Sequence, residues 1–216
     1  MSFPVLTVLR ARTDEEAMLR VKTHDDHREF ARLVERWEAP IRRLCARMLG
    51  DLHRAEDIKQ ETFLRLFEKR RAYEPKARFS TYLWRIAINL CQDELRRRNR
   101  SKESLRDSSG AEAEGEWEER AADIPGPDLR AANLEEGELV RRALAQLPEI
   151  YRTVLVLRHY EDLKLTQIAE VLEIPEGTVN SRMAEALSQL SRLLEPQFAP
   201  SSAPIPLGLP KPKLVL

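Results

Sequence analysis

Apolar residues recur at steps of three and four through the first half of the chain, which is the spacing of one buried face of an α-helix. The first stripe begins after Asp25 or Asp26, and either aspartate is a suitable helix N-cap. Gly50 follows the stripe and is expected to end the helix. Pro40 lies inside the stripe and is expected to kink or divide the helix, because proline lacks a backbone N–H.

Two more helices are expected in this half, one over residues 54–69 and one from Ser80 into an arginine-rich run. Apolar and polar residues do not alternate with a period of two over a useful length, so no strand is predicted. The helical pattern resumes later and predicts further helices over residues 138–160, 165–172 and 176–194.

The segment between the two helical halves is polar and acidic, and this composition buries too little apolar surface to offset the entropy of ordering. The last residues hold six prolines and are expected to be extended or disordered. The chain is therefore predicted to be all-α, with two small helical domains joined by a flexible acidic linker. Its predicted parts are an N-terminal extension (1–24), a first domain (25–100), the linker (101–137), a second domain (138–195) and a proline-rich tail (196–216).

The second domain has the organisation of a helix-turn-helix, because Pro175 and Gly177 supply a sharp turn between two short helices. The helix after the turn is expected to pack through its apolar residues Val179, Met183, Leu187, Leu190 and Leu194. Its other side presents Thr178, Ser181, Arg182 and Glu185, which favours binding in a DNA major groove. A plain helical hairpin that packs on a neighbour has the same spacing, and this alternative stays open.

The remaining composition excludes several classes of protein. Apolar runs are too short for a membrane span and no signal peptide is recognised, so cytoplasmic residence is expected. Cys45 and Cys91 lie at apolar helical positions and are predicted to be core residues. His24 and His27 have no nearby third ligand, so neither a metal site nor a cofactor is expected. Without a glycine-rich phosphate loop or a nucleophile–base pair, the chain is not expected to be an enzyme.

Charge is segregated along the chain although the formal net charge is zero. Residues 21–100 carry 20 Lys and Arg against 13 Asp and Glu, whereas residues 101–137 carry 4 against 11. Residues 138–195 carry 7 basic and 9 acidic residues, so the second domain is weakly acidic. The basic first domain is the half expected to contact a polyanion.

The arginine-rich run supports that expectation. Asp93–Arg97 and Glu94–Arg98 are expected to pair at i,i+4, which leaves Arg96, Arg100 and Lys102 available to phosphates. The alternative is that these cations only complement the negative end of the helix dipole. Trp37, Tyr82 and Trp84 lie in the same half, either as core residues or as platforms on which unpaired bases stack.

Four stretches, in their order along the chain, resemble the extracytoplasmic-function (ECF) group of the sigma-70 superfamily of RNA polymerase sigma factors. They are Ala55–Leu66, Phe79–Asn89, Asp93–Arg97, and Leu147–Arg152 followed by the helix-turn-helix. The resemblance covers residues 25–100 and 138–194. It implies a protein that binds core RNA polymerase, recognises the −10 and −35 promoter elements and is held inactive by an anti-sigma factor.

The resemblance also implies roles for particular residues. Contact with core polymerase falls on Asp57, Gln60, Glu61 and Arg65. Contact with the −10 element falls on Lys76, Arg78, Tyr82, Trp84, Arg85, Asn89, Arg96, Arg97 and Arg100. Contact with the −35 element falls on Thr178, Asn180, Ser181, Arg182 and Glu185.

The sequence departs from the family pattern in two places. Tyr82 and Trp84 look exchanged relative to the usual aromatic pair, and the second helix of the helix-turn-helix is unusually poor in cations. Because phosphate neutralisation supplies most non-specific affinity, the second domain alone is expected to bind DNA poorly. Two alternatives therefore stay open: a helix-turn-helix regulator that acts without polymerase, and a sigma-like protein that titrates an anti-sigma factor.

Overall fold

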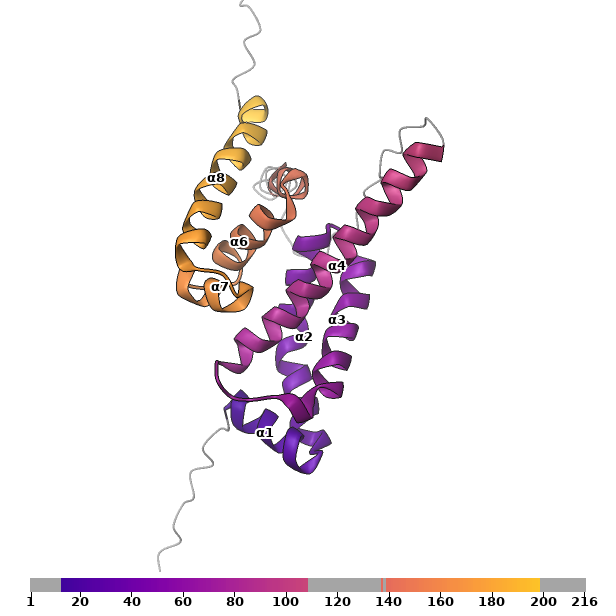
Figure 1. The fold of residues 1–216 in the computed structure, drawn as a ribbon, viewed down its shortest axis with the longest axis vertical. Coiled ribbons are helices and arrows are strands. Elements are labelled where there is room, and N and C mark those ends of the chain that lie inside the picture. Colours follow the sequence, from indigo (N-terminus) through magenta and orange to yellow (C-terminus); the bar gives the residue numbers. More distant parts are fainter. Residues whose placement is uncertain (1–12, 109–136, 138, 199–216) are drawn as a thin grey trace, which may run out of the picture.

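A computed structural model describes residues 13–108, 137 and 139–198 of the chain (Figure 1). Every regular element within these residues is a helix, which confirms the all-α fold class. The proline-rich residues 199–216 and most of the predicted linker lie outside the described residues. None of the described helices is long and apolar enough to span a membrane.

The first domain is built on side-chain caps that its sequence provides. Asp26 accepts hydrogen bonds from the backbone of Arg28 and Glu29 at the start of α2, and Asp51 accepts one from Arg54 at the start of α3. Gly50, with φ of 66°, ends α2 in the left-handed conformation that glycine tolerates. The elements are α1 (Asp14–His24), α2 (His27–Leu49), α3 (Leu52–Glu68), the short 3-10 helix η1 (Arg70–Ala72) and α4 (Phe79–Ser108).

Pro40 does not divide the first long helix, although a division was one of the two expected outcomes, the other being a kink. Residues 27–49 form one helix that contains Pro40, with buried residues such as Leu33 and Leu44 on both sides of it. Burial along a 23-residue stripe outweighs the one backbone hydrogen bond that proline removes.

The first domain also extends past both of its predicted ends. Residues 14–24, placed in an N-terminal extension, form α1, which caps itself with Thr13 and buries Ala17, Met18 and Val21. At the other end, α4 continues to Ser108, inside the predicted linker. Four apolar residues, three of them buried, lie among many charges and give a weak periodic signal, so α1 is fixed by tertiary burial rather than by its own pattern.

The second domain comprises residues 139–146, which are helical, and α6 (Glu149–His159), α7 (Leu165–Leu172) and α8 (Glu176–Phe198). Helix α8 includes Pro196, so the tail begins later than predicted. Leu187 was expected to anchor α8 but is 47% exposed, whereas the neighbouring Ala186 is fully buried. The side of α8 that packs on the core therefore keeps the predicted Val179, Met183 and Leu190 but passes through Ala186 instead of Leu187.

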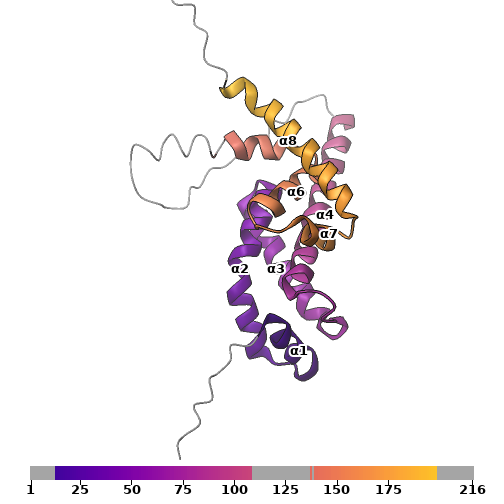
Figure 2. The same cartoon turned by 90° about the vertical axis from the view of Figure 1, so that its left-hand side faces the viewer.

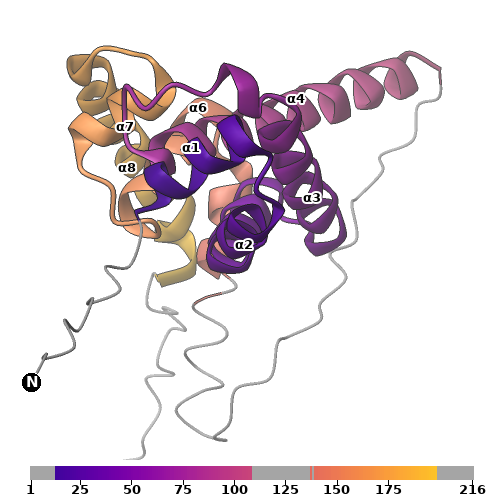
Figure 3. The same cartoon turned by 90° about the horizontal axis from the view of Figure 1, so that it is seen from below.

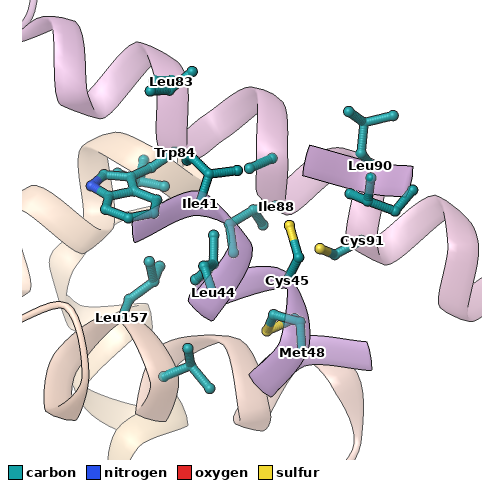
Figure 4. Packing of buried hydrophobic residues seen from close by; sticks show 14 of the residues in the cluster. Ile41, Leu44, Cys45, Met48, Leu83, Trp84, Ile88, Leu90, Cys91 and Leu157 are labelled. Atoms are coloured by element: carbon teal, nitrogen blue, oxygen red, sulfur yellow. The ribbon is translucent and has the colours of Figure 1, made fainter. Parts of the chain in front are cut away.

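The two domains share one apolar core. Helix α6 packs on α2 and α4, and α7 packs on α4, as Figures 1 and 2 show. Helix α3 lies on the far side of α2 and α4 from the second domain (Figures 1 and 3). In the close-up of the core, Leu157 of α6 lies beside Leu44 of α2 and Trp84 of α4 (Figure 4). Cys45 and Cys91 are fully buried nearby, as predicted.

Candidate nucleic-acid and protein interfaces

Helix α3 turns one face into the core and leaves the other to solvent. Ala55, Ile58, Thr62 and Leu66 are buried, and the opposite side carries Asp57, Gln60 and Leu64 at spacings of three and four. Glu61 and Arg65 lie half-exposed beside them, joined by a 2.8 Å ion pair. We call Asp57, Gln60, Glu61, Leu64 and Arg65 the α3 face.

Leu64 also belongs to the α3 face, although no expectation from the sequence pointed to it. Its side chain is 52% exposed and lies among the polar residues of the α3 face. The available signal was its helical register, because Leu64 is seven residues from Asp57 and lies off the buried stripe. A large apolar side chain at the centre of a polar rim is typical of a protein-binding surface.

The outward face of α4 carries a row of polar and basic side chains. These recur at helical spacing, so they lie along one side of the helix. We call this row the α4 stripe: Arg78, which immediately precedes the helix, and Tyr82, Arg85, Asn89, Arg96 and Arg100. Lys76 lies in the loop just before it, with its ammonium exposed and bonded to Glu74. Six of the nine residues predicted to contact the −10 element thus fall in one line.

Trp84 does not belong to the α4 stripe. It points to the opposite side of α4, is only 4% exposed and packs edge-to-face on Trp37 at 5.7 Å. Of the two alternatives expected for Trp84, the structure therefore shows the core residue, and the side chain offers no face to a base in this conformation. Tyr82 is half-buried against Tyr73 at 5.3 Å and keeps part of its ring exposed.

Helix α1 holds the loop that leads into the α4 stripe. The carboxylate of Glu15 accepts a hydrogen bond from the backbone N–H of Phe79 at 2.8 Å, and this bond lowers the pKa of Glu15. Lys22 donates to the carbonyl of Tyr73 at 2.7 Å. Because these bonds fix both ends of residues 73–79, the predicted N-terminal extension is a structural part of the candidate site.

The arginine-rich run is organised by a buried carboxylate rather than by the expected i,i+4 pairs alone. Glu94 is 6% exposed and accepts hydrogen bonds from Arg54 of α3 and from Arg97 and Arg98. Burial raises the pKa of Glu94, but the three guanidinium groups outweigh burial and hold the pKa at about 2. The predicted Glu94–Arg98 pair is confirmed, whereas Arg97 bonds to Glu94 instead of Asp93.

Helices α7 and α8 form the predicted helix-turn-helix. Glu173 takes the left-handed conformation, with φ of 54°, where the chain turns between them. Along the first turns of α8, Asn180 and Ser181 are exposed, and Thr178 and Arg182 are half-exposed. Glu185 is also half-exposed and accepts a hydrogen bond from Gln189 at 2.8 Å. This surface therefore combines small polar groups with one cation and one carboxylate.

Metal-ligating residues do not gather in the part of the chain that the structure describes: no group of three or more His, Cys, Asp or Glu side chains is placed to hold an ion there. The arrangement instead presents two surfaces, a polar face with an exposed leucine on α3 and a cationic row on α4.

Family models match both helical domains. The model described as Sigma-70 region 2 matches residues 33–101, and the model described as Sigma-70, region 4 matches residues 137–190. The α3 face and the α4 stripe fall within the first match, and the helix-turn-helix falls within the second.

The chain is similar to curated proteins over most of its length. It is 35% identical to the ECF RNA polymerase sigma factor SigW of Bacillus subtilis over 78% of this chain and 90% of that protein. It is 32% identical to the RNA polymerase sigma-H factor of Pseudomonas aeruginosa over 88% of this chain and 97% of that protein.

Solved structures share the fold at lower identity. CnrH, in complex with the cytosolic domain of CnrY, aligns with a TM-score of 0.61 and 21% identity over 85% of this chain and 97% of that chain. The sigma factor RpoE of Bartonella quintana, in complex with the anti-sigma factor NepR, aligns with a TM-score of 0.61 and 22% identity over 77% and 97%. These two matches support the same arrangement of helices.

Proposed function

The chain belongs to the ECF group of the sigma-70 family of RNA polymerase sigma factors, and on this premise we propose a role for each surface of the molecule. The α3 face binds core RNA polymerase, the α4 stripe contacts the −10 element, and α8 contacts the −35 element. Sigma factors are regulatory proteins rather than enzymes. The observation that carries the proposal is that the two sigma-70 regions match the two helical domains in order along the chain. The first of these domains bears the α3 face and the α4 stripe.

The α3 face supports the polymerase role through its chemistry. Gln60 and Leu64 are exposed and are not needed for the core, so a partner can bury them without unfolding the chain. An apolar side chain surrounded by hydrogen-bonding groups gives both affinity and orientation. Its place away from the second domain leaves the α3 face accessible in the described conformation.

The α4 stripe supports the −10 role through charge and shape. Arginines at helical spacing can meet successive phosphates of one strand, and the half-exposed ring of Tyr82 can stack on an unpaired base. With Trp84 in the core, Tyr82 takes the stacking role in this proposal. The −35 role of α8 relies on hydrogen bonds from Asn180, Ser181 and Arg182 more than on net charge.

We also propose that an anti-sigma factor binds this chain. The similar RpoE was solved with the anti-sigma factor NepR, which supports the proposal at the level of the fold. Two-hybrid screening with the full chain as bait identifies the partner.

Run-off transcription tests the proposed function directly. Purified chain and core polymerase are incubated with a library of promoter fragments, and core polymerase alone serves as the control. Defined transcripts that depend on the chain are expected. Binding of the chain alone to a palindromic operator, without chain-dependent transcripts, would instead favour a helix-turn-helix regulator. Binding to an anti-sigma factor without transcription would favour a titrating protein.

Replacing two arginines of the basic run is expected to reduce the electrostatic part of promoter binding. The double variant Arg96→Ala with Arg97→Ala removes two cations while Arg54 and Arg98 still neutralise Glu94. For promoter binding by the polymerase complex, the slope of log affinity against log salt concentration should then become shallower by about 1.5. Fluorescence anisotropy over a salt series measures this slope.

The matched control is Arg28→Ala with Arg32→Ala, which removes the same charge from the exposed first turns of α2, outside the α4 stripe. Its slope should stay close to that of the unaltered chain. Equal slopes for both double variants would show that the basic run makes no phosphate contacts.

A further inference from the structure

Helix α8 carries an exposed strip of residues without charge. Asn180, Ala184, Leu187 and Ser191 are all exposed, and they recur at spacings of three and four, so they lie along one side of the helix. We call these four residues the α8 strip. Leu187 is its largest apolar member and is 47% exposed. The strip therefore offers solvent an apolar patch between two neutral hydrogen-bonding side chains.

The α8 strip is not needed to hold the second domain together. Helix α8 packs on α6 and α7 through a different side, which carries Val179, Met183, Ala186 and Leu190. Figure 1 shows α8 at the outer edge of the molecule, with α6 between α8 and α4. A ligand can therefore cover the α8 strip without loosening the packing of the domain.

The charged and hydroxyl groups near the α8 strip are few, and two of them are engaged within the helix. Arg182 is the only cation between Glu176 and Ser191. Glu185 accepts a hydrogen bond from Gln189 at 2.8 Å, and the hydroxyl of Ser181 donates to the carbonyl of Thr178 at 3.0 Å. Because phosphate neutralisation is weak on this helix, contacts with base edges have to supply more of its affinity for DNA.

The order of side chains along the α8 strip fits the chemistry of the major groove. Adenine presents a donor and an acceptor that asparagine can pair with, and thymine presents a C5-methyl group that apolar side chains contact. At a rise of 1.5 Å per residue, Asn180 and Leu187 are about 10 Å apart along the helix. This distance equals about three base-pair steps of B-form DNA. The strip is thus long enough to contact several successive base pairs.

We infer that Ala184 and Leu187 contact thymine methyl groups in the −35 element and so determine a preference for thymine there. This inference rests on the proposed binding of the −35 element by α8, and it adds the kind of base that α8 selects. Asn180 supplies a polar contact at the N-terminal end of the strip. Contact between Leu187 and a methyl group removes apolar surface of both partners from water. Cytosine at the same position carries no methyl group and forgoes this gain.

Replacing thymine with deoxyuridine tests the inference, because it removes the C5-methyl group and leaves the pairing edge of the base unchanged. Promoter fragments are first obtained by run-off transcription with core polymerase and the full chain. Each thymine of the −35 element is then replaced singly, and binding of the polymerase complex is measured by fluorescence anisotropy. At the position that Leu187 contacts, loss of the methyl group should weaken binding about 3- to 5-fold.

The variant Leu187→Ala should abolish this difference at one position, so that the thymine and deoxyuridine promoters bind equally there. The fold should survive, because Leu187 is half-exposed and alanine is a good helix former. No charge changes, so the slope of log affinity against log salt concentration should stay the same, whereas loss of a phosphate contact would make it shallower by about 1.

The matched control is Leu52→Ala, the same substitution at a leucine that is 53% exposed at the start of α3, outside the α3 face. It should keep the full 3- to 5-fold preference for thymine over deoxyuridine, about that of the unaltered chain. A preference that persists equally in both variants would show that Leu187 is not the contact.

Two further outcomes would overturn the inference. One is a −35 element without thymine in the selected promoters, and the other is equal binding of every deoxyuridine promoter by the unaltered chain. Either result, obtained with chain-dependent transcripts, contradicts the methyl contact and leaves the proposed function standing. The absence of chain-dependent transcripts contradicts the proposed function, and the inference then fails with it.

Discussion

Replacing Gln60 and Glu61 together with alanine is expected to lower the affinity for core RNA polymerase by at least about 100-fold. Both residues lie at the centre of the α3 face, beside the exposed Leu64. Truncation removes the hydrogen-bonding groups of these two side chains. Their partner groups on the polymerase are then left unpaired when the interface closes. Co-purification with core polymerase and titration by anisotropy measure the loss.

The fold should survive this change, since neither side chain is buried. The ion pair of Glu61 with Arg65 is partly exposed and contributes about 0.5 kcal/mol, so the melting temperature should move little. The control is Glu35→Ala with Glu38→Ala, two exposed acids of α2, which should bind polymerase normally. If the Gln60/Glu61 variant still co-purifies with polymerase, the α3 face is not the docking surface.

Glu94→Gln should lower the free energy of unfolding by about 3 kcal/mol at neutral pH. Glu94 is the shared acceptor for Arg54, Arg97 and Arg98, and it ties the start of α3 to the middle of α4. Glutamine has nearly the same shape as glutamate but carries no charge. It therefore cannot neutralise the three guanidinium groups that meet at this buried side chain. Chemical denaturation with far-ultraviolet circular dichroism measures the change.

The pH dependence of this difference has a definite sign. Because the folded-state pKa of Glu94 is depressed from 4.5 to about 2, its contribution is fully present above pH 4.5. The contribution is lost as the pH falls from 4.5 to 2. The unfolding free energies of the unaltered chain and of the Glu94→Gln variant should therefore converge over that window. Asp93→Asn is the control, since Asp93 is 66% exposed and reaches Arg96 only at 4.0 Å, and it should change stability by less than about 0.5 kcal/mol. A gap that stays constant down to pH 2 would show that Glu94 is not the charged hub of this cluster.

Local signals in the sequence account for the helices and their caps. The apolar period gave α3 and α7 within two residues, and Asp26 and Gly50 bound α2 as their backbone preferences predict. The motifs that resemble the ECF group also sufficed for the family, because they combine residue identity with order along the chain. The register of α3 placed Gln60 on an outward face, and the same register held the unused signal for Leu64.

Register alone could not decide which side chains near the margin of a stripe are covered. Trp84 is buried because Trp37 of α2 and Leu157 of α6 come to lie beside it, and neither neighbour is close in sequence. Leu187 is exposed because the buried stripe of α8 follows Ala186 instead. Burial at such positions depends on the surface that the partner helix presents, which periodicity does not encode.

The sequence by itself determined where most helices of the two domains lie, how charge is divided between the two domains, and which family the chain belongs to. All of these depend on residues within a few positions of one another or on their order. Only the tertiary structure decided that α1 braces the loop before α4, that Glu94 gathers three arginines, and that Glu149 and Glu173 pair with Arg96 and Arg85. The contacts between helices join residues 40 to 88 positions apart, and their energy depends on distance in space, which appears only once the chain has folded.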